Sequence, residues 1–329
     1  MRALIVGGSG YLGQFLIRAM LDAGYARVDY TYGNNPLPSE VGGGRCNGHQ
    51  VNVVSGEGMK QSVQSIVTSG GLDVVVNCAA MSSPGACEKD PDLANQTNSP
   101  KELLLALREV FPPATIRSQT DETEKKPLLI HISTDQVYDG THENNLDADG
   151  AHVSPINVYG VSKLAAEKVV RETWPFSQAV VLRSSIITGP QSPFVPVNRP
   201  LFLDFILLSL KGNEPVTFFH DEFRNPVLAT DIARHILIIA ASKAGTIRGV
   251  FNCGGPDRVS RVQMAKTAAF ALSLSDKNIQ SAPSASVNRG VKSPLDISMD
   301  SSKLEKATGV RASGWELQTK ISAGVKFIV

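Results

Sequence analysis

The stretch Ala3-Leu4-Ile5-Val6-Gly7-Gly8-Ser9-Gly10-Tyr11-Leu12-Gly13 decides the fold of this chain. Its first four residues are an apolar run that indicates a buried parallel strand, and a helical segment begins at Tyr11. Gly7 permits a tight turn out of the strand, Gly10 lets the backbone approach a pyrophosphate, and Gly13 lets the helix pack closely on the sheet. The amides at the helix start favour an anion. We therefore predict a dinucleotide site with contacts from Gly7, Gly10, Tyr11, Leu12 and Gly13, although a plain turn in an α/β protein is the alternative.

Apolar runs alternate with helical segments along the rest of the chain. We expect strands at Ala3–Val6, Arg27–Tyr32, Gln50–Val54, Asp73–Cys78, Leu128–Ser133, Ala179–Arg183 and Val250–Cys253. Helices are expected at Tyr11–Ala23, Glu57–Ser69, Asp92–Val110 and Val158–Thr173. This alternation predicts an α/β fold, a Rossmann-type doubly wound parallel sheet covered on both faces. Ligands of such sheets bind at the carboxyl ends of strands, where the glycine motif, Ala79-Ala80, Thr134 and Ser184-Ser185 fall.

The chain divides into two unequal parts. Residues 1–183 are expected to form an NADP-binding Rossmann domain, with a strand and a helix added from about residues 227–253. Residues 184–329 are expected to form mainly a smaller C-terminal substrate-binding lobe. Polar or proline-rich segments predict loops at 112–127, 140–155, 189–200 and 281–294.

Composition narrows the functional classes. The 329 residues are 42% hydrophobic and 19% charged, with a net charge of +1, so we expect a globular protein with no nucleic-acid or membrane partner. No apolar run is long enough for a spanning helix, and the N-terminus enters the first strand directly. The cysteines Cys46, Cys78, Cys87 and Cys253 lack metal-ligand spacing, so we predict no metal site and expect a reducing, cytoplasmic location.

Tyr159-Gly160-Val161-Ser162-Lys163 carries the candidate chemistry. The spacing places Tyr159 and Lys163 on one face of a helix. A phenol is a poor acid near neutral pH, but a neighbouring ammonium stabilises the phenolate, so the pair can exchange a proton with a substrate oxygen. Many helices carry the same spacing as a solvated surface pair, and that reading stays open.

The order of these motifs resembles the extended short-chain dehydrogenase/reductases. The matching segments are Gly7–Gly13, Asn77–Ala80, Ile132–Gly140, Tyr159–Leu164, Leu182–Ser185, Arg224–Ala233 and Phe251–Pro256, which together span nearly the whole chain. Within that family the chain is most similar to the dTDP-4-dehydrorhamnose reductase branch and to the related regulatory beta subunits of methionine adenosyltransferase.

The resemblance implies a role for each matching position. Thr134 would bond the substrate oxygen with Asp135 beside it, Tyr159 would exchange the proton, and Lys163 would bind the nicotinamide ribose and keep the tyrosine acidic. Asn98 would anchor a structural water. Thr134 and Asp135 could instead cap a loop, and Asn98 could be a turn residue. The other implied cofactor contacts are Asn34, Cys78, Ala79, Ala80 and Ser185.

The sequence departs from the reductase branch where substrate would bind. After the alanine pair, that branch has a tyrosine–threonine type of dipeptide and acidic residues, whereas this chain has Met81-Ser82-Ser83-Pro84-Gly85-Ala86-Cys87-Glu88. Arg224 offers a planar fork of donors for a substrate phosphate or carboxylate, or forms a surface salt bridge with Asp221 or Glu222. The candidate substrate contacts are Met81, Ser82 and Arg224.

The end of the second strand indicates the cofactor. An acid there favours NAD(H), but this strand ends in Gly33-Asn34-Asn35, and Asp29 lies too early in the strand. No arginine stands at the strand end, although Arg45 could reach it from the following loop. We therefore expect NADP(H) to be favoured over NAD(H).

Two functions from different classes follow. The first is an NADP(H)-dependent oxidoreductase that transfers a hydride to the keto group of a sugar-nucleotide-like or other small molecule, with Tyr159 as proton donor. The second is an NADP-binding regulatory subunit without catalysis, like the methionine adenosyltransferase beta subunit. Under the first function, the partners are a small-molecule substrate and, as the resemblance implies, a second copy of the chain in a homodimer. The second has a catalytic subunit as partner.

Overall fold

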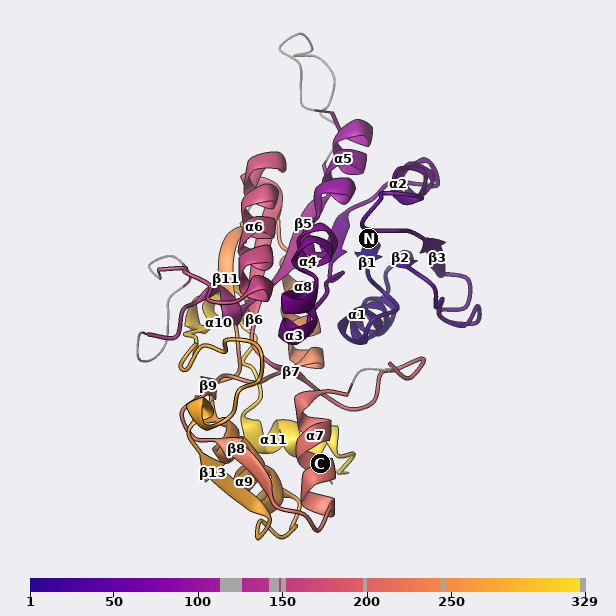
Figure 1. The fold of residues 1–329 in the computed structure, drawn as a ribbon. Coiled ribbons are helices and arrows are strands. Elements are labelled where there is room, and N and C mark those ends of the chain that lie inside the picture. The colour runs from indigo at the N-terminus through magenta and orange to yellow at the C-terminus, as the bar shows by residue number, and fades with distance from the viewer. Residues whose placement is uncertain (113–125, 142–147, 149–151, 198–199, 244–245, 326–329) are drawn as a thin grey trace.

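A parallel sheet of seven strands forms the centre of the computed structural model (Figure 1). The structure describes residues 1–112, 126–141, 148, 152–197, 200–243 and 246–325. The strand order is β11-β6-β5-β4-β1-β2-β3, and every neighbouring pair is parallel. The strands are β1 (Arg2–Val6), β2 (Arg27–Tyr32), β3 (Cys46–Gln50), β4 (Val74–Asn77), β5 (Leu128–Thr134), β6 (Ala179–Ser184) and β11 (Gly249–Cys253). The predicted Rossmann-type fold is confirmed.

Helices cover both faces of this sheet because successive strand residues point to opposite sides. Ala3 and Ile5 pack with α1 (Tyr11–Asp22) and α8 (Ala229–Ala241) in one apolar cluster. Leu4 and Val6 pack on the other side in a second cluster. That second cluster is built with α2 (Met59–Thr68), α5 (Lys101–Val110) and the last turns of α6 (Val158–Thr173).

The smaller lobe has its own apolar core around the fully buried Trp315. It contains α7 (Phe202–Lys211), β8 (Val216–Phe219), α9 (Arg261–Ala271), β13 (Ile279–Ala282) and α11 (Trp315–Ser322). Two short strand pairs join it to the sheet region: β7 (Ile187–Thr188) with β10 (Val227–Leu228), and β9 (Phe223–Arg224) with β12 (Val259–Ser260). The remaining elements are α3 (Pro84–Lys89), α4 (Pro91–Asn98), α10 (Ser302–Thr308), η1 (Asp135–Val137), η2 (Phe176–Gln178) and η3 (Ser284–Ser286).

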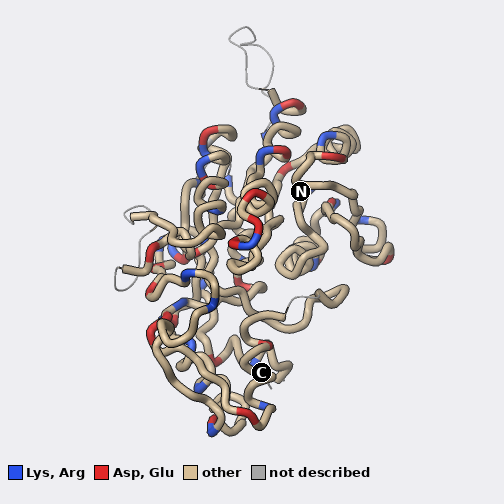
Figure 2. The backbone as a smooth tube through the Cα atoms, in the orientation of Figure 1, with Lys and Arg blue, Asp and Glu red and all other residues tan. Residues whose placement is uncertain are grey.

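Charges of both signs are interspersed over the described backbone (Figure 2), as a net charge of +1 leads one to expect. Among the helices that the structure describes, none combines the length and the apolar content that crossing a bilayer requires.

Two predicted elements are wrong. The third strand is Cys46–Gln50 and not Gln50–Val54. Its sequence Cys-Asn-Gly-His-Gln is polar because it lies at the sheet edge with β2 as its neighbour, whereas Val54 lies in a turn in which Asn52 Oδ1 accepts from the Val54 amide. The single helix expected at Asp92–Val110 is two helices, α4 and α5, because Pro100 cannot continue the first.

The four predicted loops agree with the structure to different degrees. Residues 189–197 and 200 contain no helix or strand. The segment 281–294 begins inside β13 and includes η3. Most of 112–127, and residues 142–147 and 149–151 of the loop expected at 140–155, lie outside the described residues.

A buried ion pair fastens α6 to the sheet. Glu167 on α6 and Arg183 on β6 are 2% and 4% exposed. Arg183 donates to both carboxylate oxygens of Glu167, at 3.1 and 2.8 Å. Ser133 on β5 also donates to Glu167, and Arg183 donates to the hydroxyl of Tyr138, which donates in turn to Asn252. Helix α6, strands β5, β6 and β11, and the turn after η1 therefore meet in one buried polar network.

We expect Glu167→Ala to destabilise the protein by about 3–5 kcal/mol, because it leaves the Arg183 guanidinium buried without its carboxylate. Glu172→Ala on the same helix is the matched control. Glu172 pairs with Lys168 across exposed side chains and should cost less than about 1 kcal/mol. Urea unfolding measures both losses, and equal losses would mean that the buried pair does not hold α6.

Candidate active site

The glycine loop between β1 and α1 is closed by backbone contacts. Gly7 has a φ of +79°, and a side chain there would meet the Ala79 backbone at 2.9 Å. A Cβ at Gly13 would lie 2.5 Å from the Gly7 carbonyl oxygen. Gly10 is the N-cap of α1 and has no side chain to cap the first amides of the helix. These are the features of a cradle for a phosphate: close backbone packing and uncapped amides at a helix start.

Gln14 ties this loop to the segment that leads into the smaller lobe. Its side chain is fully buried, and its Nε2 donates to the carbonyls of Ser9 and Val195 at 3.0 and 3.1 Å. Its Oε1 accepts from the amides of Phe194 and Val195. Sequence analysis missed Gln14, because its partners Phe194 and Val195 lie about 180 positions away along the chain.

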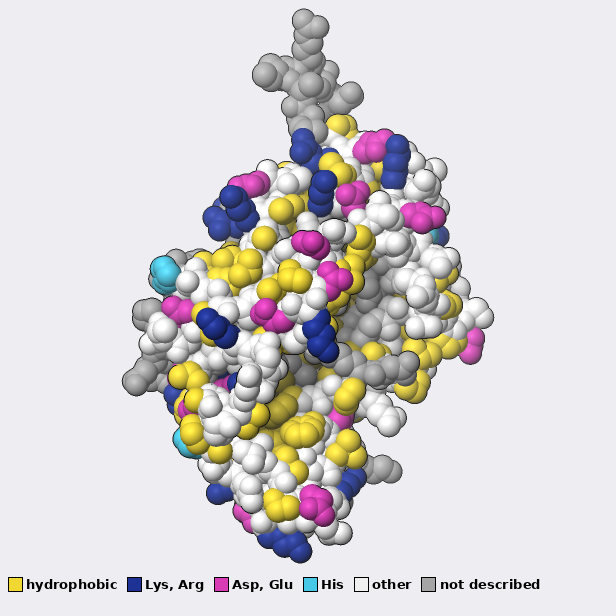
Figure 3. Space-filling model, viewed as in Figure 1, with side chains coloured by type: hydrophobic (Ala, Val, Ile, Leu, Met, Phe, Trp, Pro, Cys, Tyr) yellow, Lys and Arg dark blue, Asp and Glu magenta, His cyan; other side chains and the backbone are white. Residues whose placement is uncertain are grey.

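A cavity of about 600 Å³ lies beside this connection, between Tyr11, residues of the segments 189–197 and 200–201, and helices α7 and α11. Tyr11 donates its hydroxyl to the Pro190 carbonyl at 2.9 Å. Among the described residues, Tyr11 is the one predicted cofactor contact that lines this cavity. In the face drawn in Figure 3, the surface is hollowed between the sheet region and the smaller lobe, with apolar side chains along part of it.

Asn98 fixes the backbone that follows β4. Its Oδ1 accepts from the Met81 amide at 2.7 Å, and its Nδ2 donates to the Met81 carbonyl at 3.3 Å and to the Ser162 hydroxyl at 2.8 Å. Asn98 is fully buried at the end of α4. It therefore acts as more than a turn residue, because it joins the Cys78-Ala79-Ala80-Met81 strand end to α6.

Tyr159 and Lys163 lie in the first turns of α6, where the Asn157 side chain caps the helix. Tyr159 is 9% exposed and packs with Cys87, Ala94 and Met81. Lys163 is 2% exposed, and its Nζ donates to the Ile132 carbonyl at 2.6 Å. The pair is therefore buried and is not the solvated surface pair that the same spacing can form.

Burial changes the pH range in which Lys163 is charged. It lowers the pKa of this ammonium to about 8, while the Glu167 carboxylate and Cys78 act in the opposite direction. The charged form of Lys163 is therefore present below about pH 8 and is lost above it.

Thr134, Asp135 and Ser185 meet at the carboxyl ends of β5 and β6. Thr134 Oγ1 donates to Asp135 Oδ1 at 3.2 Å, and Ser185 Oγ donates to Asp135 Oδ2 at 2.8 Å. Thr134 also accepts from the Gln136 amide. It therefore caps the following turn, as the alternative predicted, and also lies at the carboxyl end of β5. Burial raises the pKa of Asp135, although Arg224 and the two hydroxyls counteract it.

Arg224 is buried at 1% exposure and not at the surface. Its fork donates to the carbonyls of Phe223, Leu295 and Pro294 at 2.7, 3.0 and 2.8 Å, and to the Ser293 hydroxyl at 3.3 Å. The expected surface salt bridge with Asp221 or Glu222 is thus replaced by backbone acceptors of the 293–295 segment.

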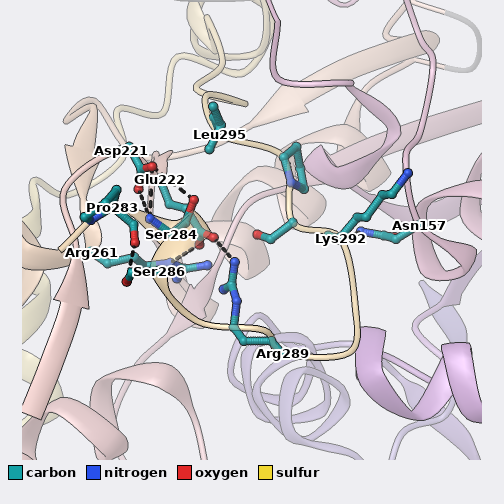
Figure 4. Close-up of polar contacts among 12 residues, drawn as sticks. Asn157, Asp221, Glu222, Arg261, Pro283, Ser284, Ser286, Arg289, Lys292 and Leu295 are labelled. Atoms are coloured by element: carbon teal, nitrogen blue, oxygen red, sulfur yellow. Dashed lines mark hydrogen bonds and ion pairs between the residues drawn. The ribbon is translucent and has the colours of Figure 1, made fainter.

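The two acids beside Arg224 have other partners, which Figure 4 shows. Glu222 is fully buried and accepts from Arg261 and Arg289. Asp221 accepts from the amide and hydroxyl of Ser284.

The end of β2, where the cofactor ribose is expected, carries no unpaired acidic side chain among the described residues. Asp29 is fully buried in the middle of β2 and accepts from Arg27 and His49 at 2.7 and 2.8 Å. Although burial alone would raise it, these hydrogen bonds hold the pKa of Asp29 below its ordinary value. Arg45 points away, because it donates to the Leu21 carbonyl in the last turn of α1 and to the Tyr25 carbonyl after the helix. Asn34 is exposed just after β2.

The comparison with protein families covers almost the whole chain. Residues 1–323 match the model described as the RmlD substrate binding domain. The chain belongs to this family. Among curated relatives, a probable low-salt glycan biosynthesis reductase of Haloferax volcanii is 26% identical over 94% of this chain and 93% of its own. The methionine adenosyltransferase 2 subunit beta of Mus musculus is also 26% identical, over 95% of this chain and 87% of its own.

Solved structures of sugar-nucleotide enzymes share the fold of this RmlD family member. A dTDP-4-dehydrorhamnose reductase of Bacillus anthracis in complex with NADP superposes with a TM-score of 0.76 at 19% identity, over 97% of both chains. A UDP-glucose 4-epimerase of Thermus thermophilus in complex with NAD gives a TM-score of 0.75 at 20% identity, over 99% of this chain and 98% of its own.

We expect Gly10→Val to abolish binding of NADP(H), because a side chain at the N-cap pushes a pyrophosphate off the start of α1. Calorimetric titration measures the loss, and circular dichroism should show that the fold survives. Gly212→Val is the matched control, since Gly212 has nearly the same backbone angles (φ −78°, ψ 171°, against φ −73°, ψ 171°) but ends α7 in the other lobe. Unchanged affinity in Gly10→Val would remove the glycine loop from the site.

Proposed function

We propose that this chain is an NADP(H)-dependent reductase that transfers a hydride to a carbonyl group. The observation that carries the proposal is the buried Tyr159–Lys163 pair on α6, set against the carboxyl end of β5 where Thr134 lies. The glycine cradle at the end of β1 fits a dinucleotide, because side chains at Gly7 and Gly13 would collide with the backbone around it. The cofactor, when bound, supplies the hydride.

The side chains divide the proton chemistry of the reduction. As the carbonyl carbon takes up the hydride, the Tyr159 hydroxyl would give its proton to the carbonyl oxygen. The Lys163 ammonium stabilises the resulting phenolate, which it can do below its pKa of about 8. Thr134 donates a hydrogen bond that orients the carbonyl oxygen. Much of the rate gain comes from this positioning.

The substrate class in this proposal is a sugar-nucleotide-like or other small ketone. The reductase relatives and the matched family support it. In the proposed division of the chain, residues 1–183, with a contribution from 227–253, bind NADP(H), and residues 184–329 mainly bind substrate. Met81 and Ser82 would contact the substrate from the strand end that Asn98 holds.

The second candidate function is a cofactor-binding subunit of a larger enzyme. The observation that favours it is the match to methionine adenosyltransferase 2 subunit beta over 95% of this chain. The unusual segment after Ala80 also favours it. In this candidate the partner is a catalytic subunit, and the protein binds NADP(H) without turnover. A screen of NADPH oxidation against sugar-nucleotide ketones and small ketones separates the two candidates.

We expect Tyr159→Phe to reduce turnover about 100- to 10,000-fold and to leave NADPH binding nearly unchanged, because the variant loses only the proton donor. Tyr25→Phe is the matched control. Tyr25 is buried, and its hydroxyl has no hydrogen-bond partner among the described residues, so removing it should leave turnover unchanged. Wild-type turnover in Tyr159→Phe would exclude the tyrosine as the proton donor.

The protein should bind NADPH more tightly than NADH, because Asp29 is occupied by Arg27 and His49 and the exposed end of β2 carries Asn34 instead of an acid. Asn34→Asp should reverse the preference, since a carboxylate repels the 2′-phosphate and accepts from a free 2′-hydroxyl; we expect a change in the affinity ratio of at least about tenfold. Direct titration of both cofactors measures the ratio. Tighter binding of NADH by the unmodified protein would contradict this assignment.

A further inference from the structure

His131 is a buried titratable residue that the proposed reaction leaves without a role. It lies on β5, three residues before Thr134, and is fully buried. Its Nδ1 lies 3.1 Å from Nδ2 of Asn77 on the neighbouring strand β4. Its Nε2 lies 3.4 Å from Nζ of Lys163. The imidazole therefore stands between the β4 strand end and the lysine of the proposed catalytic pair.

Asn77 determines which ring nitrogen carries the proton. The Asn77 Oδ1 accepts from the Ala79 amide at 3.2 Å, so its NH₂ group faces the imidazole. An amide NH₂ only donates, and Nδ1 of His131 must therefore be the acceptor. Burial and the nearby Lys163 lower the pKa of His131 well below its ordinary value, so the ring is neutral. A neutral ring with an unprotonated Nδ1 carries its proton on Nε2.

The Nε2–H group thus faces the amine of Lys163. An ammonium has donors only and would oppose this N–H, whereas a neutral amine has a lone pair that can accept it. The bond from Nζ to the Ile132 carbonyl is compatible with either form of the lysine. One hydrogen bond in this arrangement is therefore available to the neutral lysine alone.

We propose that His131 is a positioning residue: it donates from Nε2 to the neutral form of Lys163 and so sets the pH at which this lysine loses its charge. The consequence for catalysis rests on the proposed function, in which charged Lys163 stabilises the Tyr159 phenolate. Besides His131 and the Tyr159 of the proposed pair, the groups among the described residues that act on the charge of Lys163 are Glu167 and Cys78. Glu167 is bound by Arg183, and burial raises the pKa of Cys78 to about 12, so this thiol stays protonated where Lys163 titrates.

The tautomer is tested directly by the ring ¹⁵N resonances of histidine, assigned with a His131→Phe variant. The expected result is an unprotonated Nδ1 and a protonated Nε2 in the wild-type protein. Asn77→Asp should reverse them, because a carboxylate accepts both from the Ala79 amide and from an Nδ1–H group. A protonated Nδ1 in the wild-type protein would overturn the proposal, because the deciding protonation state is read on the wild-type protein itself.

The charge of Lys163 is tested by the pH dependence of the NADPH dissociation constant. Affinity for the phosphate-bearing cofactor should fall above about pH 8 as the ammonium is lost. His131→Phe should move this limb upward by about one pH unit, the tenfold change that one hydrogen bond of ordinary net strength corresponds to. Asn77→Asp should also move the limb upward, because its tautomer lets Nε2 accept from the ammonium.

His235→Phe is the matched control for the pH experiment. His235 is a buried histidine on α8 whose Nδ1 lies 2.8 Å from the Thr308 hydroxyl. The charges that act on its pKa are Asp231 and Arg234 and not Lys163, so its loss should leave the limb in place. A wild-type affinity without a limb in this range, or a limb unmoved in His131→Phe, would overturn the proposal. None of these readouts needs turnover. A failure to reduce any ketone would therefore count against the proposed reductase and leave the role of His131 standing.

Discussion

The seating of helix α6 on the strand ends is the constraint on which the candidate site depends. Lys163 is bonded to the Ile132 carbonyl of β5, Ser162 to Asn98 at the end of α4, and Glu167 to Arg183 of β6. These contacts are buried and directional, so a slip of the helix by one residue would leave a charge without its partner inside the core. Tyr159 is therefore held at the strand edge by the contacts that fix its helix.

Sequence reasoning predicted the elements that depend on local signals. The glycine turn after β1 requires glycine for backbone reasons, and α6 has the predicted bounds of Val158–Thr173. The edge strand Cys46–Gln50 was not predicted because it lacks the apolar run that the inner strands have. Gln14 and His131 were not predicted for another reason. Their contacts are with residues on other elements, and neither residue belongs to a sequence motif. Arg224 was expected to face a ligand, but its donors are taken by the chain itself.

Paired acidic and basic side chains extend from Asp135 into the smaller lobe. Their pairing limits the number of unoccupied hydrogen-bond donors that a substrate could meet there. Arg261 and Arg289 share the buried carboxylate of Glu222, and Arg258 holds Asp296. Each of these arginines has an acceptor within the chain. An anionic group placed among them would compete with Glu222 for the two guanidinium groups instead of meeting unoccupied donors. Recognition of such a group would then need a change in this network, whereas an uncharged substrate would leave it intact.

Cofactor binding and substrate recognition therefore have different structural supports. The glycine loop and α6 are fixed by buried contacts to the sheet, so the close backbone packing of the loop and the Tyr159–Lys163 geometry belong to the fold itself. The segment after Ala80 is held through the backbone of Met81, while Ser82 is exposed. Under the proposed function, a chain of this kind can keep its cofactor site and the Tyr159–Lys163 pair while its substrate side changes. The chain is 26% identical both to a relative named as a reductase and to one named as a subunit of another enzyme, which agrees with such a separation.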